Sequence, residues 1–136
     1  MSYKNLLELF VTNRNKLQKS LRAFLTPYSI DDYIKMGAKI WLSDDGKSGF
    51  AITPDGELIS VFSLVKGRGD EIVSQAVKMG AKRLDCLGDH LKNLYERHGF
   101  KVVRVVPFNE KYAPKEWDYA KFGKPPLYIM ERNSTS

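Results

Sequence analysis

One stretch, residues 58–100, constrains the fold of this chain most strongly. It consists of an apolar run, a basic turn with two glycines, a helical pattern, a second apolar run and another helix that ends at Gly99. This order predicts strand, turn, helix, strand and helix. A strand that returns through a helix usually runs parallel to its predecessor, so the stretch predicts two parallel strands side by side.

The N-terminal part of the chain predicts helices. Between residues 3 and 24 apolar side chains recur mostly at intervals of three and four, which predicts one amphipathic helix or two. The polar residues 12–16 are where this pattern would be interrupted. Ser29 is expected to cap a short helix that Gly37 closes. The apolar positions of the first pattern are Leu6, Leu9, Phe10, Leu17, Leu21 and Phe24.

Three apolar runs then predict an antiparallel meander. They cover residues 38–43, 49–53 and 57–64, and turn sequences separate them. Asp70 is expected to cap the next helix, which ends before Gly80. The remaining predicted elements are a strand at 82–87, a helix at 89–98, and strands at 101–108 and 127–131.

Together these elements predict an α/β fold with a mixed sheet. A chain of 136 residues suits one domain, with N-terminal helices at 1–36, a core at 38–131 and a short tail at 132–136. The segment 109–126 is long and has no clear period. Its aromatic residues favour order over disorder.

Charge and hydropathy limit the kinds of partner that this chain can have. The formal net charge of +6 favours anionic partners, such as nucleic acid, an acidic protein or a phosphate-rich cofactor. A basic surface that only maintains solubility explains the charge equally well, because the cations are scattered among acids. No apolar run is long enough to span a bilayer and no secretory signal is present, so we expect a cytoplasmic protein without a membrane partner.

The cysteine and histidine content excludes two kinds of site. Cys86 is the one cysteine, so no internal disulfide can form, and its apolar neighbours predict a buried thiol. One cysteine and two histidines eight residues apart offer no recognised ligand spacing, so no metal is expected.

Two short motifs carry a family resemblance. The turn "KGRGDE" at 66–71 and the helix end "LYERHGF" at 94–100 resemble motifs of the GNAT superfamily of N-acetyltransferases. The order of the predicted elements resembles that family over roughly residues 38–131, and the sequence is most similar to small GNAT-like proteins of bacteria and phages. The resemblance implies an acyl-CoA N-acyltransferase fold, with acetyl-CoA in a cleft between two splayed parallel strands.

The glycine turn is the predicted phosphate site. Successive N–H groups at a helix N-terminus attract an anion, and a turn that only joins strand to helix is the structural alternative. The resemblance implies that the pyrophosphate of coenzyme A binds this turn and that strand 61–64 holds the pantetheine arm. Lys66 stands in the family's Arg or Gln position and Gly69 matches its central glycine, whereas Glu71 stands where the family prefers Gly or Ala. The predicted cofactor-binding residues are Val61, Phe62, Ser63, Val65, Lys66, Gly67, Arg68, Gly69 and Asp70.

The predicted catalytic residues are Tyr95 and Asp85. The resemblance implies that Tyr95 protonates the departing coenzyme A thiolate, and a phenol with a pKa near ~10 can do so at neutral pH. Tyr95 would otherwise only pack on the apolar face of its helix. Asp85 or Glu57 could accept the proton of the amine. The two histidines, His90 and His98, are expected at the surface.

The predicted function is transfer of an acetyl group from acetyl-CoA to a primary amine. No serine or cysteine nucleophile motif is present, so direct attack in a ternary complex is preferred. The acceptor is a small molecule or a protein, and the aromatic segment 112–122 forms either its wall or a cover over the core. The alternative is a non-catalytic module on this scaffold that binds acyl-CoA, nucleic acid or a protein. Glu71, and Gly88 where the family often has Asn, favour that alternative.

Overall fold

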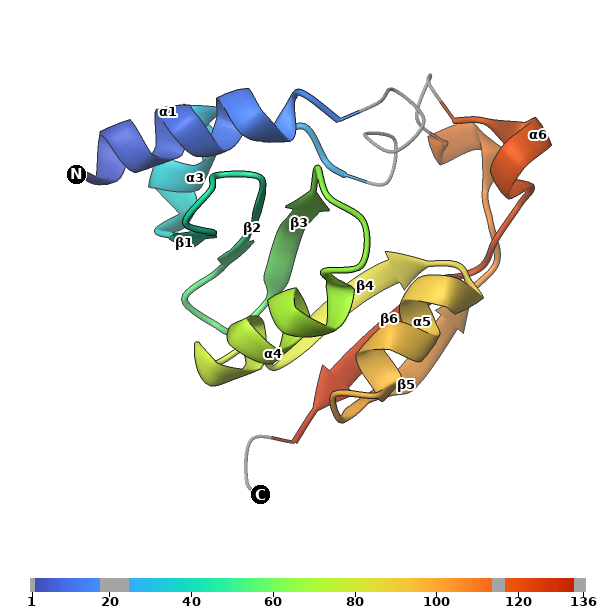
Figure 1. The fold of residues 1–136 in the computed structure, drawn as a ribbon. Helices are drawn as coiled ribbons and strands as arrows, with labels where there is room; N and C mark the ends of the chain where they lie inside the picture. Colours follow the sequence, from blue (N-terminus) through green and yellow to red (C-terminus); the bar gives the residue numbers. More distant parts are fainter. Residues whose placement is uncertain (1, 18–24, 114–116, 134–136) are drawn as a thin grey trace.

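The computed structural model of the chain describes residues 2–17, 25–113 and 117–133. Figure 1 shows its elements. The helices are α1 (Tyr3–Arg14), α3 (Ile30–Met36), α4 (Gly69–Lys78), α5 (Asp89–Glu96) and α6 (Tyr119–Phe122), with a 3-10 turn η1 (Glu110–Tyr112). The strands are β1 (Lys39–Leu42), β2 (Ser48–Ile52), β3 (Leu58–Ser63), β4 (Arg83–Leu87), β5 (Phe100–Val106) and β6 (Leu127–Arg132).

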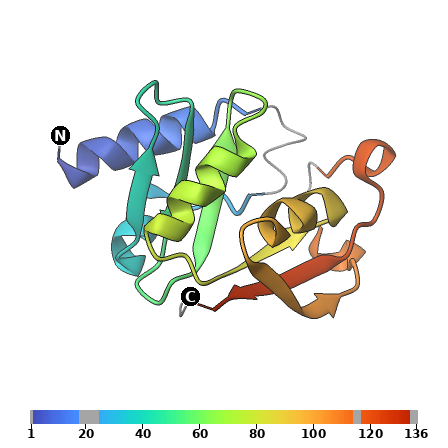
Figure 2. The same ribbon diagram turned by 60° about the horizontal axis from the view of Figure 1, so that its bottom comes forward.

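The strands form two antiparallel sheets that meet at one point. The first sheet is the predicted meander β1-β2-β3, and the second has the order β4-β6-β5. β3 and β4 are parallel, as predicted, but they pair through a single bridge between Glu57 and Arg83. The Gly56 carbonyl accepts hydrogen bonds from the backbone N–H groups of Lys82 (2.8 Å) and Arg83 (3.2 Å). Beyond this bridge the two strands diverge into separate sheets (Figure 2).

Helices cover the first sheet on both faces. Ile72, Val73 and Ala76 of α4 share one apolar core with Phe50 and Ile52 of β2. On the other face a second core contains residues of α1, α3, β2 and β3, namely Leu7, Phe10, Tyr33, Ala51 and Phe62. α5 lies on the same side of the molecule as α4 and packs on the second sheet (Figure 2). We call the place where β3 and β4 separate the cleft, and it has an α4/α5 side and an α1/α3 side.

The buried face of α1 differs from the predicted one. Leu7 and Phe10 are fully buried, whereas Leu9 is 40% exposed. The helix ends at Arg14, inside the polar segment expected to interrupt it, and both Asn13 and Arg14 are buried. Asn13 Nδ2 donates to the Gly46 carbonyl at 2.8 Å, which fastens α1 to the β1–β2 turn. The predicted apolar positions Leu21 and Phe24 lie outside the described residues.

Of the two predicted helix caps, the one on α3 is confirmed and the one on α4 is wrong. α3 has the expected cap: the Ser29 hydroxyl accepts from the Asp32 N–H, the Asp32 carboxylate accepts from the Ser29 N–H, and Gly37 ends the helix at φ +68°. The prediction that Asp70 caps α4 is wrong, because the N-cap is Arg68 and no side chain caps it. Asp70 instead binds the side chains of Arg97 and His98, which follow α5, in charge-assisted bonds.

The C-terminal elements agree with the predicted order. Gly99 has φ +91°, a left-handed conformation that glycine adopts without strain, and the next residue, Phe100, is 1% exposed. Cys86 is buried, with its Sγ 3.8 Å from the Met130 sulfur, as predicted for this thiol. Within the described residues, no helix is both long and apolar enough to cross a membrane.

Candidate functional site

The edge of β3 that faces β4 is open beyond the Glu57 bridge. The register of β2 and β3 passes from Gly49–Phe62 to Ala51–Ile59, so β3 carries one extra residue, a β-bulge. Ser60 lies in this bulge with φ +57°, a left-handed conformation that is rare for serine. Among the described residues no backbone group of β4 pairs with residues 59–63. This segment therefore presents backbone donors and acceptors to the cleft.

The turn between β3 and α4 offers a run of free backbone donors. No acceptor for the N–H groups of residues 66–71 exists among the described residues. Gly67 has φ +85° and open space around it, so the turn itself requires glycine there. A Cβ on Gly69 would lie 3.1 Å from Leu94 Cδ2, so this glycine also lets α4 pack against α5. The predicted phosphate turn thus has both a structural role and the donors that an anion needs.

Arg68 is held by the β1–β2 turn. Its Nη1 donates to Asp45 Oδ1 and to Ser48 Oγ, both at 3.1 Å, and its Nη2 donates to Asp45 Oδ2 at 2.6 Å. These bonds, with one from the Ser43 hydroxyl, hold the pKa of Asp45 well below its usual range. The Arg68 guanidinium is therefore occupied in holding the β3–α4 turn against the β1–β2 turn. Lys66 is exposed and forms no ion pair among the described residues, which leaves it available to an anion.

The acidic residues of the turn are partly neutralised. The Asp70 carboxylate accepts from Arg97 Nε at 3.2 Å and lies 2.8 Å from His98 Nε2. The bonds from Arg97 and then His98 lower the pKa of Asp70. Asp70 therefore locks the start of α4 to the end of α5, and its charge is balanced. Glu71 is exposed at the first turn of α4, where its charge lies close enough to raise the pKa of Arg68.

Tyr95 lies in the core between α5 and the second sheet. It is 5% exposed, and its ring meets that of Phe100 edge-on with centroids 5.8 Å apart. Burial raises the pKa of Tyr95, and nearby Cys86 and Asp85 add to the rise. Its hydroxyl has no hydrogen-bond partner among the described residues, although buried hydroxyls are usually paired. The buried position of Tyr95 agrees with a packing role. Its unpaired hydroxyl carries a proton that is available for donation.

Asp85 lies on the opposite face of β4 from Tyr95. Its neighbours Leu84 and Cys86 point into the core that contains Tyr95, and side chains alternate along a strand. The Asp85 side chain reaches solvent, yet the surrounding protein desolvates it and raises its pKa. The two predicted catalytic groups therefore flank β4 from the α4/α5 side and the α1/α3 side.

Tyr28 is a further site residue that the sequence did not reveal. It precedes α3 and is half-buried, with its ring 5.5 Å from that of Tyr33. Burial raises the pKa of Tyr28, and the charges of Glu57 and, more weakly, Asp85 raise it further. The one sequence signal was an aromatic residue directly after Pro27, which is too common to single out.

A buried arginine holds Tyr28 in place. Arg14 is 5% exposed, and its Nη1 donates to the Tyr28 carbonyl and to the Tyr33 hydroxyl, both at 2.8 Å. The Tyr33 hydroxyl lies 2.6 Å from Ser60 Oγ in the β3 bulge. No described carboxylate pairs with Arg14. This chain of contacts joins α1, the segment before α3 and the bulge into one network.

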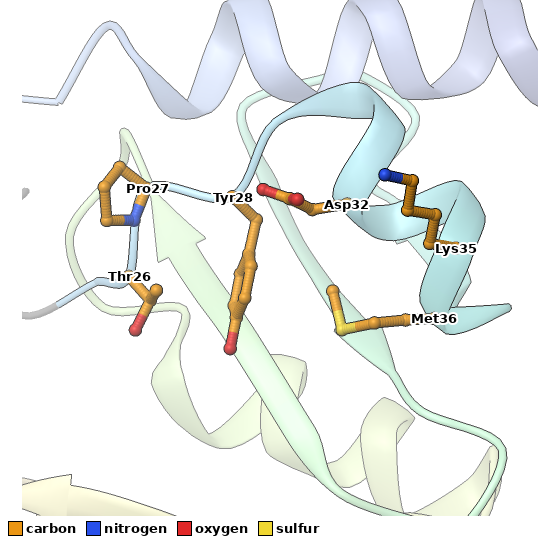
Figure 3. A pocket seen from close by; sticks show the side chains of 6 residues that line it. All are labelled: Thr26, Pro27, Tyr28, Asp32, Lys35 and Met36. Carbon is orange, nitrogen blue, oxygen red and sulfur yellow. The ribbon is translucent and has the colours of Figure 1, made fainter.

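An open hollow of about 450 Å³ lies beside Tyr28. Figure 3 shows the six side chains that line it, with Asp32, Lys35 and Met36 of α3 facing the segment of residues 26–28. The remaining lining residues are Thr26, Pro27 and Tyr28. The hollow is therefore on the side of the molecule that carries α3.

The other sequence candidates occupy less central positions. His90 is exposed, as expected, but His98 is 19% exposed and bound to Asp70, so its expected surface position is wrong. In the segment 109–126, Trp117 packs on Phe108 and Phe122, and its Nε1 donates to the Gly123 carbonyl at 2.9 Å. These aromatic contacts favour the alternative in which the segment covers the core and does not form the wall of an acceptor site. Residues 114–116 lie outside the described residues.

The splayed strands, the bulged open edge and the donor-rich turn belong to a fold that this chain shares with solved N-acyltransferase structures. One similar solved structure is described as that of a candidate phosphinothricin N-acetyltransferase; it has 15% sequence identity and a TM-score of 0.59 over 100% of this chain and 96% of the other. An acyl-CoA N-acyltransferase from Pseudomonas aeruginosa is 16% identical, with a TM-score of 0.60 over 98% of this chain and 93% of the other. The GNAT fold predicted from the motifs is therefore confirmed. No protein-family model and no curated protein sequence matches the chain.

Proposed function

We propose that this protein is an N-acetyltransferase that uses acetyl-CoA and a primary amine. The observation that carries the proposal is the run of unbonded N–H groups at 66–71, continuous with the open edge of β3. The donors suit a pyrophosphate, with Lys66 as the available cation, and the residues 61–63 suit the amide groups of a pantetheine arm. Acetyl-CoA supplies the activated acetyl thioester.

The two proposed catalytic groups lie on opposite sides of β4, and each is assigned a different proton transfer. Asp85 accepts a proton from the ammonium on the α1/α3 side, directly or through water, so that the amine nitrogen can bond to the thioester carbon. As the carbon–sulfur bond breaks, Tyr95 donates its phenolic proton to the sulfur on the α4/α5 side. The nitrogen loses its second proton on becoming the amide, and this proton restores Tyr95 through solvent. Asp85 then releases the proton that it took, so the net products are the amide, the free thiol and one proton. The raised pKa of Asp85 supports its role as a base, because this carboxylate binds a proton more readily, whereas the role of Tyr95 is proposed from its position and its unpaired hydroxyl.

Calorimetry with acetyl-CoA tests the proposal. We expect binding, and we expect Lys66→Gln to weaken it by about fivefold, the effect of losing one exposed ion pair. Lys78→Gln is the matched control, because Lys78 is an exposed lysine at the other end of α4. Absence of acetyl-CoA binding to the wild-type protein would refute the assignment.

A second candidate function is acyl-CoA binding without turnover. Gly88 favours it, because its φ of +87° and ψ of 163° lie in a region that only glycine populates, so no Asn side chain can occupy this position. Glu71 adds an acid close to the phosphate turn. Acetyl-CoA binding with no amine-dependent thiol release would support this function, whereas binding to nucleic acid would show itself by a steep loss of affinity with salt.

A further inference from the structure

We propose that a chain of side-chain hydrogen bonds presets the shape of the phosphate turn at 66–71. The chain runs from Asp45 through Arg68 and Ser48 to Ser63. Asp45 and Ser48 lie outside the turn, and the chain makes them positioning residues for acetyl-CoA. The inference rests on the proposed binding of acetyl-CoA and names residues that adjust its affinity through the turn.

The strand end before the phosphate turn is fixed by hydrogen bonds. The Leu64 N–H donates to the Lys47 carbonyl at 2.7 Å, which continues the pairing of β3 with β2. The Ser63 hydroxyl then donates to the Val65 carbonyl at 2.6 Å and accepts from the Val65 N–H at 3.2 Å. The unbonded N–H groups begin directly after Val65. The phosphate turn and the β1–β2 turn lie at the same end of the first sheet (Figure 2).

Ser48 connects this strand end to Arg68. It is fully buried, with its Oγ 3.1 Å from Arg68 Nη1 and 2.9 Å from Ser63 Oγ. An arginine can only donate, and the Ser63 hydrogen goes to the Val65 carbonyl, so the Ser48 hydroxyl donates to Ser63 Oγ. Each hydroxyl therefore both accepts and donates. Hydrogen bonds arranged in this way strengthen one another, and here the first donor is a cation.

Asp45 fixes the other end of the chain. Its carboxylate accepts from both terminal nitrogens of Arg68, and also from the Ser43 hydroxyl at 2.7 Å and the Lys47 N–H at 3.0 Å. The last two bonds hold the carboxylate within its own turn. Because Arg68 is the N-cap residue of α4, this carboxylate also fixes the start of the helix. Both ends of the phosphate turn are thus held to the hairpin of β1 and β2.

The middle of the phosphate turn depends on these two ends. Gly67 has φ +85°, and a Cβ built on it would meet no atom within 4 Å, so no described side chain packs there. Glycine has the largest backbone freedom of any residue, and ordering it opposes binding. A turn that is ordered before the ligand arrives avoids this cost. The preset turn should therefore bind a pyrophosphate more tightly than a loose turn with the same donors.

The test compares two thioesters by calorimetry on the full-length protein. They are acetyl-CoA and S-acetylpantetheine, which has the acetyl group and the pantetheine arm but no phosphate. Ser48→Ala removes the central hydroxyl, so we expect acetyl-CoA to bind about fivefold more weakly, the effect of one net hydrogen bond. The affinity for S-acetylpantetheine should not change. In steady-state kinetics the KM for acetyl-CoA should rise while kcat is retained.

Two further sets of variants support the comparison. Asp45→Asn, at the exposed end of the chain, repeats the test without a change in the core and should also weaken acetyl-CoA by about fivefold. Asp55→Asn is the matched control, because Asp55 forms the corresponding ion pair with Arg83 at the opposite end of the first sheet. Ser63→Ala should act like Ser48→Ala, whereas Ser63→Thr keeps the hydroxyl and should retain the affinity.

The outcomes separate this inference from the proposed function. Unchanged acetyl-CoA affinity in Ser48→Ala and Asp45→Asn, or equal weakening of both thioesters, would overturn the inference while acetyl transfer stands. Lower unfolding stability with unchanged affinity would likewise leave the chain a structural role alone. Weakened acetyl-CoA binding in these variants, without amine-dependent thiol release by the wild-type protein, would support the positioning role and refute acetyl transfer. Absence of acetyl-CoA binding to the wild-type protein would overturn both.

Discussion

The two sides of the cleft are built in different ways. On the α4/α5 side, the phosphate turn is one continuous segment, residues 66–71, whose backbone supplies the donors. On the α1/α3 side, Tyr28, Arg14 and Asp85 come from three distant parts of the chain, and side chains supply the chemistry. A local backbone site can be recognised in a sequence, whereas an assembled side-chain site depends on tertiary packing. The comparison predicts that substitutions on the two sides affect different substrates.

The largest effect is expected at Tyr95. Tyr95→Phe removes the proposed acid but keeps the buried ring, so we expect kcat to fall by roughly 10²- to 10⁴-fold. Acetyl-CoA affinity should change little. Tyr3→Phe is the control, because Tyr3 donates only to the Ala38 carbonyl, far from the cleft. Steady-state kinetics across pH checks the prediction, and unchanged turnover of Tyr95→Phe would leave this residue a packing role alone.

Asp85 should show a smaller effect with a characteristic pH dependence. Asp85→Asn is expected to lower kcat by roughly 10- to 100-fold, because it removes the proposed base and leaves a side chain of the same size. The base must be deprotonated, and desolvation raises the pKa of Asp85. Activity should therefore fall with decreasing pH at values above the ~3.9 of an ordinary aspartate. A pH–rate profile whose acid limb persists in Asp85→Asn would assign the base to another group.

A substitution of Arg14 should affect the α1/α3 side of the cleft and leave the α4/α5 side unchanged. Arg14→Met leaves the Tyr28 carbonyl and the Tyr33 hydroxyl without their donor, so we expect a loss of about 1–3 kcal/mol in unfolding free energy. The KM for the amine should rise several-fold while acetyl-CoA affinity is retained. Arg104→Met, at an exposed position on β5, is the control. Denaturant unfolding and calorimetry measure the two quantities, and equal weakening of both substrates would contradict the division.

The smallest effect is expected at the two glycines that flank α4. Gly67 and Gly80 both have positive φ, +85° and +97°, with open space around them, so alanine at either should cost about 1–2 kcal/mol. Only Gly67→Ala should also weaken acetyl-CoA binding, by about fivefold, because Gly67 shapes the phosphate turn and Gly80 follows the far end of the helix. Thermal unfolding and calorimetry on the pair check this, and equal effects on binding would show that the turn holds no ligand.

The sequence predicted those parts of the fold that local patterns encode. The meander, the cap by Ser29 and the left-handed Gly99 were placed correctly, because alternation, capping oxygens and glycine conformations act over a few residues. The buried face of α1 was not, since Leu7 rather than Leu9 meets the sheet. Asp70 was assigned to a cap because its competing partners, Arg97 and His98, are distant in sequence.

By itself, the sequence determined the order of the elements, the turn at 66–71 and the place of Tyr95 at a helix end. Only the tertiary structure decided that β3 and β4 touch at Glu57 and Arg83 and then separate. It also decided that Arg68 binds Asp45, and that Arg14 donates to both the Tyr28 carbonyl and the Tyr33 hydroxyl. The physical reason is range: backbone conformation follows from neighbouring residues, whereas the pairing of charges and the opening of a cleft depend on which distant surfaces pack together.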